Sequence, residues 1–133
     1  MQPPARPCDS GTMVRCLIVD DSPWFLDAAR SLLEREGITV VGVASNGAEA
    51  LRRTAEFRPD VMLLDIDLGG ESGFELAGRV EEDERHRPRV ILISTHAGED
   101  YAELIAASPA CGFLAKADLS AKAIRRLLGG EAT

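Results

Sequence analysis

Residues 59–76 read PDVMLLDIDLGGESGFEL, and residues 16–34 read CLIVDDSPWFLDAARSLLE. Each stretch contains a continuous apolar run, which is typical of a strand buried on both faces of a parallel sheet. Each run ends at aspartate, and after a short turn the apolar residues have the spacing of an amphipathic helix. The two stretches therefore predict strand-helix units of an α/β fold.

Apolar runs and helical patterns alternate along the rest of the chain. The predicted strands are Cys16–Val19, Val40–Ala44, Val61–Leu64, Val90–Ile93 and Phe113–Ala115. The predicted helices run from Ser22 to Gly37, from Asn46 or Gly47 to the residue before Pro59, from Ser72 into the charged stretch 81–87, over Asp100–Ala107 and over Ser120–Leu128. Such alternation gives a parallel sheet with helices on both faces, because strand-helix-strand crossovers are nearly always right-handed. We expect an open, doubly wound (βα)5 sheet of order 2-1-3-4-5, the flavodoxin-like arrangement, since five units are too few for the usual barrel.

The helical patterns also predict caps and inward faces. The expected inward residues are Phe25, Ala28, Ala29, Leu32 and Leu33 in the first helix, Ala48, Leu51 and Ala55 in the second, Leu76 and Val80 in the third, and Ala121, Ile124 and Leu128 in the fifth. Ser22 is placed to cap the first helix, and Ser72 with Glu75 has the spacing of a capping box at the third.

Length and composition indicate one soluble domain. We assign residues 1–13 to a Pro-rich disordered tail, 14–129 to the folded domain and 130–133 to a short C-terminal tail. The apolar runs are far shorter than the roughly 20 residues of a membrane span. Because the N-terminus lacks the apolar core of a secretory signal, we expect a cytoplasmic protein whose cysteines are free thiols. A net charge of −7 argues against direct nucleic-acid binding.

Polar side chains follow four of the predicted strands. They are Asp20 and Asp21, Asp65, Ser94 and Lys116. Parallel strands bring their carboxyl ends to one edge of the sheet, where α/β proteins bind ligands. Three carboxylates at that edge repel one another unless a cation neutralises them, which implies a hard divalent ion such as Mg²⁺. We expect Asp21 and Asp65 to bind it directly and Asp20 to hold a metal-bound water.

Asp65 is then placed to act as a nucleophile. A carboxylate that attacks phosphorus forms an aspartyl phosphate, a known type of covalent intermediate. The metal, Lys116 and the hydroxyl of Ser94 would neutralise charge on the phosphoryl oxygens. Taken singly, each group has an ordinary alternative as a cap, a turn residue or a solvated side chain. Their occurrence together, each after a strand, favours a phosphoryl-transfer site.

The sequence resembles the receiver domain of bacterial two-component response regulators over residues 14–128. The matching stretches are CLIVDDSPWFLDAARSLLE, PDVMLLDIDLGGESGFEL, VILIST at 90–95 and GFLAK at 112–116. The resemblance implies that Asp65 accepts a phosphoryl group from a sensor histidine kinase. It also implies that Mg²⁺ is bound by Asp20, Asp21, Asp65 and the backbone carbonyl of Asp67.

The resemblance further implies a conformational switch. Ser94 matches the switch hydroxyl of the family, for which Thr95 is a neighbouring alternative, Lys116 matches the family's lysine and Phe113 its switch aromatic. Phosphorylation would draw in the loop of Ser94, bury Phe113 and change the face made by the fourth helix, the fifth strand and the fifth helix. An unknown downstream protein would bind this face, and the domain would be a monomer or a phosphorylation-dependent dimer. Beyond its own phosphotransfer and dephosphorylation, we expect no enzymatic activity.

Three positions depart from the family pattern. Ala117 follows the lysine where many receivers have a cis-proline, so we expect a trans peptide bond there. Gly69 and Gly70 stand where a proline is common, which we expect to loosen the connection after Asp65. The side chain of Asp67 adds a carboxylate beside the site, and the sequence leaves its role open.

Two other interpretations stay open at this point. Asp65 and Asp67 also resemble the DxD motif of haloacid-dehalogenase-type phosphatases, although here the acidic pair precedes the motif instead of following it. The second alternative is a receiver fragment of a larger DNA-binding transcriptional regulator. We favour a stand-alone regulator, because the residues after Leu128 do not resemble a linker.

Overall fold

The computed structural model describes residues 14–82, 88–95 and 101–129. The strands are β1 (Arg15–Val19), β2 (Thr39–Ala44), β3 (Val61–Asp65), β4 (Arg89–Ser94) and β5 (Gly112–Ala115). The helices are α1 (Pro23–Arg35), α2 (Gly47–Phe57), α3 (Gly73–Glu82), α4 (Ala102–Ala107) and α5 (Ala121–Leu127), and a 3-10 helix, η2 (Lys116–Asp118), follows β5. The predicted tails 1–13 and 130–133, the charged stretch from 83 and the predicted helix start at Asp100 lie outside the described residues. Within the described part, no helix combines the length and the apolar character needed to cross a membrane.

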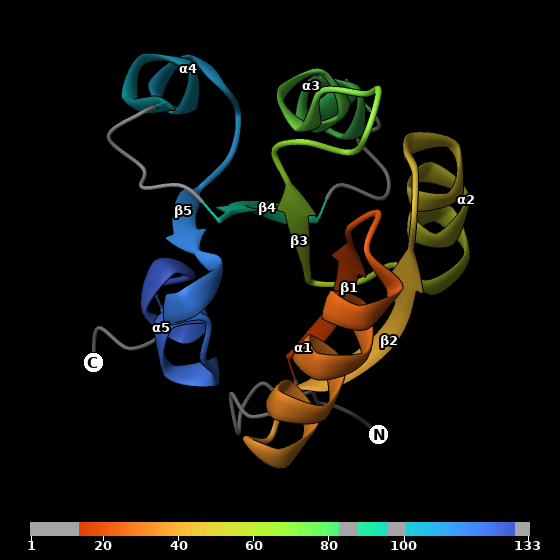
Figure 1. Cartoon of the computed structure of the whole chain (residues 1–133), viewed down its shortest axis with the longest axis vertical. Helices are drawn as coiled ribbons and strands as arrows, with labels where there is room; N and C mark the ends of the chain where they lie inside the picture. Colours follow the sequence, from red (N-terminus) through yellow and green to blue (C-terminus); the bar gives the residue numbers. More distant parts are fainter. Residues whose placement is uncertain (1–13, 83–87, 96–100, 130–133) are drawn as a thin grey trace, which may run out of the picture.

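The strands form one parallel sheet in the order β2-β1-β3-β4-β5. In Figure 1, α2, α3 and α4 lie on one side of the sheet, and α1 and α5 lie on the other. The register pairs Val19 with Leu64 and Ser94 with Ala115, so these strands end at a common edge. The predicted doubly wound, flavodoxin-like fold and its strand order are confirmed.

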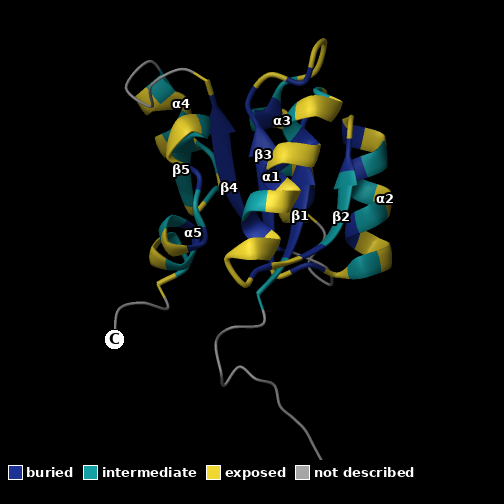
Figure 2. Cartoon of the chain, turned by 60° about the horizontal axis from the view of Figure 1, so that its bottom comes forward, coloured by how far each residue is buried: buried dark blue, intermediate teal, exposed yellow. Residues whose placement is uncertain are grey.

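Apolar side chains fill the space on both sides of the sheet. The strands β1, β3 and β4 are buried almost along their whole length, as their continuous apolar runs predict. Ile18 and Leu63 belong to a cluster with Ile124 of α5, whereas Leu17 belongs to a second cluster with Leu76 of α3. Figure 2 shows these buried strands between helices whose outer surfaces are exposed.

Polar side chains cap α1, α2, α3 and α5 at their N-termini. The backbone donors and side-chain acceptors are Phe25 N and Ser22 Oγ at 3.3 Å, Glu49 N and Asn46 Oδ1 at 2.8 Å, Glu75 N and Ser72 Oγ at 3.4 Å, and Ala123 N and Ser120 Oγ at 3.0 Å. Such caps satisfy N–H groups that have no partner within the helix. The cap predicted at Ser22 is therefore confirmed, as is the Ser72 side-chain half of the capping box predicted with Glu75.

The predicted inward face of α2 is wrong at Ala48 and Ala55 and confirmed at Leu51, which packs against a core cluster. The buried residues are Gly47, Ala50 and Thr54, whereas Ala48 and Ala55 are exposed and Leu51 is half-buried. Small residues on the buried face allow a close approach of the helix. The buried hydroxyl of Thr54 is satisfied because it donates to the carbonyl of Ala50 at 2.7 Å. Glycine and threonine are not counted as apolar in the helical pattern. The pattern therefore predicted the adjacent face of the helix.

The other predicted faces are largely correct. In α1, Ala28 is exposed and Leu26 is buried in its place. Trp24, in the first turn of the same helix, is 79% exposed. The predicted residues that are buried are Ala29, Leu33, Leu76, Val80, Ala121 and Ile124, and those that are half-buried are Phe25, Leu32 and Leu128.

Candidate functional site

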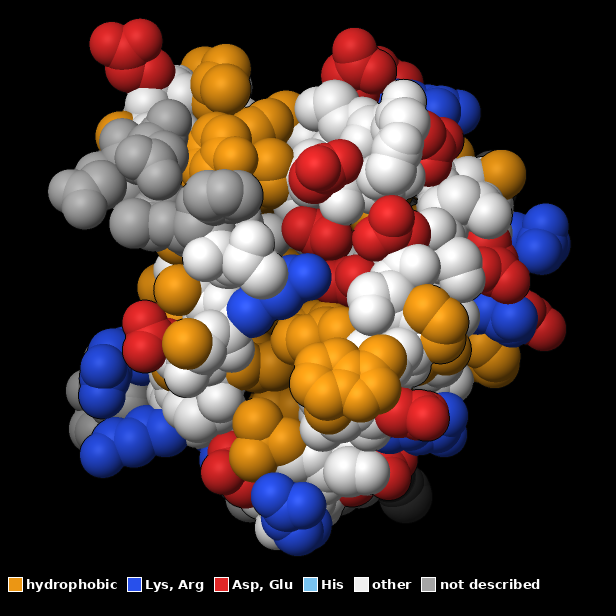
Figure 3. Space-filling view, viewed as in Figure 1, with side chains coloured by type: hydrophobic (Ala, Val, Ile, Leu, Met, Phe, Trp, Pro, Cys, Tyr) orange, Lys and Arg blue, Asp and Glu red, His pale blue; other side chains and the backbone are white. Residues whose placement is uncertain are grey.

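The carboxyl ends of β1 and β3 bring three carboxylates together. Asp20 and Asp21 follow β1, Asp65 ends β3, and the two strands are neighbours in the sheet. One carboxylate oxygen from each residue lies within 4.8 Å of the others. Asp20 and Asp65 are buried and Asp21 is exposed, so the cluster meets solvent on one side. In Figure 3, acidic side chains gather on this face, with a basic side chain beside them and hydrophobic side chains below.

The side chain of Lys116 reaches this cluster from the end of β5. Its Nζ lies 2.6 Å from Asp20 Oδ2 and 3.5 Å from Asp65 Oδ2. Asp20 Oδ1 accepts a hydrogen bond from the backbone N–H of Ser22 at 2.9 Å, which fixes the buried carboxylate. The ring of Phe25 lies on another side of the lysine, with its centroid 4.4 Å from Nζ. The ammonium group is therefore held between two carboxylates and an aromatic face.

The pKa of Asp65 is raised from 3.8 to about 6, chiefly by burial and then by the charge of Asp20. Two groups act in the opposite direction: the backbone N–H of Asp67, which donates to Asp65 Oδ1 at 3.2 Å, and the ammonium of Lys116. A bound cation would favour the ionised form of Asp65, because an adjacent positive charge lowers the pKa of a carboxyl group. The clustered donors are carboxylate oxygens, the type of ligand that Mg²⁺ prefers, so the residues present fit this ion.

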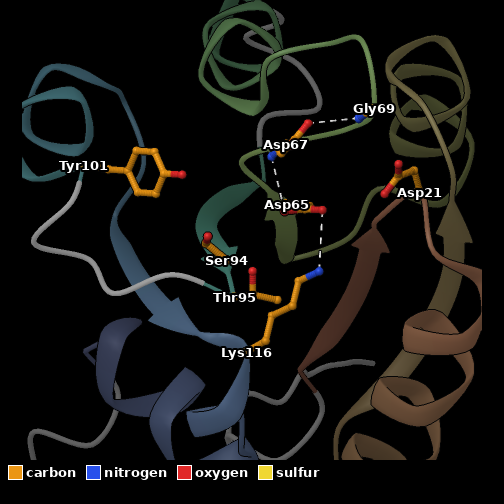
Figure 4. Close-up of a pocket in the computed structure, with 8 residues that line it drawn as sticks. All are labelled: Asp21, Asp65, Asp67, Gly69, Ser94, Thr95, Tyr101 and Lys116. Atoms are coloured by element: carbon orange, nitrogen blue, oxygen red, sulfur yellow. Dashed lines mark hydrogen bonds and ion pairs between the residues drawn. The ribbon is translucent and has the colours of Figure 1, made fainter.

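A cavity of about 220 Å³ opens beside the cluster. It is lined by Asp21, Asp65, Asp67, Gly69, Ser94, Thr95, Tyr101 and Lys116 (Figure 4). Ser94, which ends β4, is 5% exposed, whereas Thr95 is exposed. Both hydroxyl-bearing residues line the cavity, so Thr95 stays an alternative to Ser94.

The loop between β3 and α3 forms one wall of the cavity. Among the described residues, the carboxylate of Asp67 is not part of the three-aspartate cluster, and its Oδ1 accepts a hydrogen bond from Gly69 N at 3.1 Å. Gly69 has a φ of 74°, a left-handed conformation that favours glycine. Asp67 and Ser72 form an antiparallel bridge that closes the loop. The glycines expected to loosen this connection therefore take part in a hydrogen-bonded turn.

The residues expected to form the switch lie across β4 and β5. Phe113 on β5 is half-buried and packs against the core cluster that includes Leu76. The switch hypothesis assumes an exposed ring in the unphosphorylated state, and this residue is only partly exposed. The peptide bond between Lys116 and Ala117 is trans, as predicted. Ser94 pairs with Ala115 in the sheet, which places the predicted hydroxyl next to the strand end that carries Lys116.

Two residues of the site were not expected there from the sequence. Phe25, predicted only as an inward residue of its helix, contacts Lys116. Tyr101 lines the cavity, and its ring centroid lies 6.2 Å from that of Phe74 on α3. Both contacts join elements that are far apart in the chain, so no local motif indicates them.

Residues 16–127 match the family described as the response regulator receiver domain. The chain belongs to this family. We therefore interpret Asp65 and Asp67 as part of a receiver domain and not as the motif of a haloacid-dehalogenase-type phosphatase. The match includes the acidic pair before these residues and the lysine after them.

Curated relatives of this receiver domain include longer proteins. A "putative transcriptional regulator" of Pseudomonas aeruginosa is 35% identical over 118 residues, which cover 84% of this chain and 56% of that protein. A "protein-glutamate methylesterase/protein-glutamine glutaminase 5" of Myxococcus xanthus is 38% identical over 121 residues, which cover 89% of this chain and 34% of that protein. The chain thus spans from about a third to somewhat more than half of the length of these relatives.

Among solved structures, the receiver domain is similar to the response regulator TrrA of Thermotoga maritima in complex with Mg²⁺ and beryllofluoride. The TM-score is 0.74 and the sequences are 26% identical, with 88% of this chain and 98% of that chain covered. That complex is a property of TrrA.

Proposed function

We propose that this chain is a phosphorylation-dependent response regulator in which Asp65 accepts a phosphoryl group from a phosphohistidine of a sensor histidine kinase. The observation that carries the proposal is the buried Asp65 carboxylate, clustered with Asp20 and Asp21 within 4.8 Å and contacted by Lys116 at 3.5 Å. A carboxylate oxygen of Asp65 attacks phosphorus while the P–N bond of the phosphohistidine breaks. The bond electrons leave with the imidazole, which takes up a proton.

The other side chains of the site bind and orient the phosphoryl group. Asp20, Asp21 and Asp65 would hold Mg²⁺, with the backbone carbonyl of Asp67 as a further ligand. The ion supplies positive charge that lets the anionic donor approach the carboxylates. Lys116 changes from pairing with two aspartates to pairing with a phosphoryl oxygen, and the hydroxyl of Ser94 donates to another.

We also propose that phosphorylation acts on the surface of α4, β5 and α5. Ser94 ends β4 and pairs in the sheet with β5, which carries Phe113. A shift of Ser94 would therefore move the neighbouring strand that holds this ring. A downstream protein would bind this surface, and the domain would be a monomer or dimerise on phosphorylation. Cytoplasmic location and the lack of other enzymatic activity belong to the same proposal.

Absence of direct nucleic-acid binding remains a prediction from the net charge of −7. Several relatives carry the name of a transcriptional regulator or regulatory protein, so the prediction concerns only residues 1–133. A gel-shift titration of the purified chain against mixed-sequence duplex DNA, at low salt where charge contacts are strongest, checks it. A shifted complex at micromolar protein would contradict it.

The proposed phosphorylation is tested with a small phosphoryl donor. With Mg²⁺ and acetyl phosphate, intact-protein mass spectrometry should detect a single added phosphoryl group that alkali removes, as expected for an acyl phosphate. Asp65→Asn should abolish the product, and EDTA should block it in the native protein, because the donor then meets uncompensated carboxylates. Normal labelling of Asp65→Asn would disprove the assignment of the phosphoacceptor.

A further inference from the structure

Glu71 connects the loop of the candidate site to a helix that lies outside the site. The residue lies between β3 and α3, and its Oε1 accepts a hydrogen bond from the backbone N–H of Gly47 at 2.7 Å. Gly47 is the first residue of α2. Its N–H has no partner within the helix, and a carboxylate at this end of a helix also interacts favourably with the helix dipole.

Glycine at position 47 makes room for this contact. A Cβ atom there would lie 3.0 Å from Glu71 Oε2 and 3.3 Å from Glu71 Oε1, closer than most such contacts. Gly47 is buried although Glu71 is exposed, so the carboxylate covers the backbone at the start of α2. The contact joins residues that are 24 positions apart in the chain.

The opposite side of the same loop touches the carboxylate cluster. The backbone N–H of Asp67 donates to Asp65 Oδ1 at 3.2 Å. A Cβ atom on Gly69 would lie 2.9 Å from Asp21 Oδ2, so the backbone of Gly69 lies directly against that carboxylate. Within the loop, the carbonyl of Glu71 accepts from the N–H of Leu68 at 3.0 Å, which links the outer end of the loop to its inner end.

We propose that Glu71 is a positioning residue for the phosphoryl-transfer site. By binding the first N–H of α2, its carboxylate holds the loop 66–72 so that the backbone of Asp67 and Gly69 stays against Asp65 and Asp21. The inference rests on the proposed function, since it assigns Glu71 a role in metal binding and phosphorylation at that site. The loop supplies the proposed carbonyl ligand of Asp67, so its position affects metal affinity directly.

A simple capping role for Glu71 predicts a different result, and Glu49 provides the matched control. Glu49 also has a carboxylate bound to a backbone N–H at the start of α2, that of Ser45, with Oε1 at 2.7 Å. Unlike Glu71, Glu49 belongs to α2 itself and holds no part of the site loop. Loss of either carboxylate removes one charged cap and one negative charge, but only loss of Glu71 releases the loop.

The experiment compares Glu71→Ala, Glu49→Ala and Glu71→Gln with the native chain. Calorimetric titration with Mg²⁺ measures affinity, acetyl phosphate labelling at saturating Mg²⁺ measures rate, and thermal unfolding measures stability. Groups that orient metal ligands typically change affinity by about 10–100-fold, and we expect about tenfold weaker Mg²⁺ binding in Glu71→Ala, because Glu71 acts through the loop backbone. Glu49→Ala should bind Mg²⁺ as the native chain does, although its unfolding temperature should fall at least as far, because Glu49 also pairs with Arg53 at 3.5 Å. Glu71→Gln keeps an acceptor oxygen and should recover most of the affinity.

Amide spectra of the metal-free protein test positioning without reference to phosphorylation. In Glu71→Ala the resonances of Asp67 and Gly69 should shift along with that of Gly47, whereas in Glu49→Ala they should stay in place. Unchanged Asp67 and Gly69 resonances in Glu71→Ala overturn the inference, and so does an equal loss of Mg²⁺ affinity in the two alanine variants. A native chain that takes up no phosphoryl group would refute the proposed function instead, while the spectra still decide whether Glu71 positions the loop.

Discussion

The two sides of the candidate site are built very differently. On one side, β1 and β3 are almost wholly buried, and the loop after Asp65 is closed by hydrogen bonds within itself and to α2. On the other side, the residues of β5 are half-buried, and α4 spans only Ala102–Ala107, with none of its described residues buried. Tyr101 precedes α4 without making a side-chain cap, whereas Ser22 caps α1.

This difference separates the proposed chemistry from the proposed switch. Metal binding and phosphoryl transfer need carboxylates held in one geometry, and the buried strands β1 and β3 provide it. A surface that changes between two arrangements needs few buried contacts, because regions of low local stability are the ones that open or shift at low cost. The predictions below test whether the contrast is real, beginning with the largest effect.

Amide hydrogen exchange should give a large contrast between β3 and α4. The amides of Val61–Asp65 are in a buried central strand, whereas those of Ala102–Ala107 lie on a short helix with no buried residue. We expect α4 to exchange roughly a thousandfold faster or more, since core strands open only with global unfolding while weakly packed segments open locally. Exchange followed by NMR at constant pH measures both regions in one sample. Equal protection of β3 and α4 would remove the basis of the comparison.

Asp65→Asn should stabilise the metal-free protein. Because the native state holds the proton of Asp65 up to about pH 6, whereas an unfolded aspartate releases it near 3.8, native stability falls as the pH rises between these values. The asparagine variant escapes this loss, so it should gain about 2–3 kcal/mol at pH 8 and roughly half of that at pH 5. Urea unfolding of both proteins at the two pH values, in EDTA, provides the measurement. A variant that is less stable than the native protein at pH 8 would show that burying the charged carboxylate beside Asp20 does not destabilise the native state.

Beryllofluoride with Mg²⁺ should shift amide resonances in the less tightly packed region. We expect changes in 94–95 and 101–128 that extend beyond the neighbours of Asp65, because Ser94 is drawn toward the new oxygens. Ser94→Ala should keep the shifts around Asp65 and lose most of those on β5 and α5. Thr95→Ala is the control for the alternative hydroxyl. Shifts confined to the surroundings of Asp65 in the native protein would reject the switch.

Asp67→Asn should raise the rate of labelling by acetyl phosphate by a few-fold. The carboxylate of Asp67 is exposed and lines the cavity, so it adds a negative field where the anionic donor approaches. Asparagine keeps an acceptor oxygen for the N–H of Gly69, which preserves the turn. Initial rates at saturating Mg²⁺ measure the effect. An unchanged rate would indicate a solvated side chain without influence, and a slower rate would reverse the prediction.

Much of the architecture and the chemical groups could be predicted because local patterns determine them. Continuous apolar runs indicate the strands, and serine or asparagine before an amphipathic stretch indicates where a helix begins. The strand order places Asp20 and Asp65 side by side, so their meeting in the structure follows from topology. These features need no knowledge of side-chain packing.

The remaining features depend on contacts between distant segments. Thr54 can face inward because its hydroxyl donates to the carbonyl of Ala50, a contact that hydrophobic periodicity does not register. The contact of Glu71 with Gly47 arises only when the loop after β3 lies beside α2, and an isolated glutamate in a polar loop gives no sign of it. Phe25 contacts Lys116 although 91 positions separate them.

Trp24 gives the protein a built-in optical reporter. It is the only tryptophan in the sequence, and it lies in the first turn of α1, three positions after Asp21, with 79% of its surface exposed. Its fluorescence in the free protein should therefore have the long-wavelength emission of a solvated indole. A partner domain that docks over the first turn of α1 would remove this indole from water and should move its emission to shorter wavelengths. Rearrangement of the distant α4 surface would leave the indole in water, so docking and switching can be followed separately in unlabelled protein.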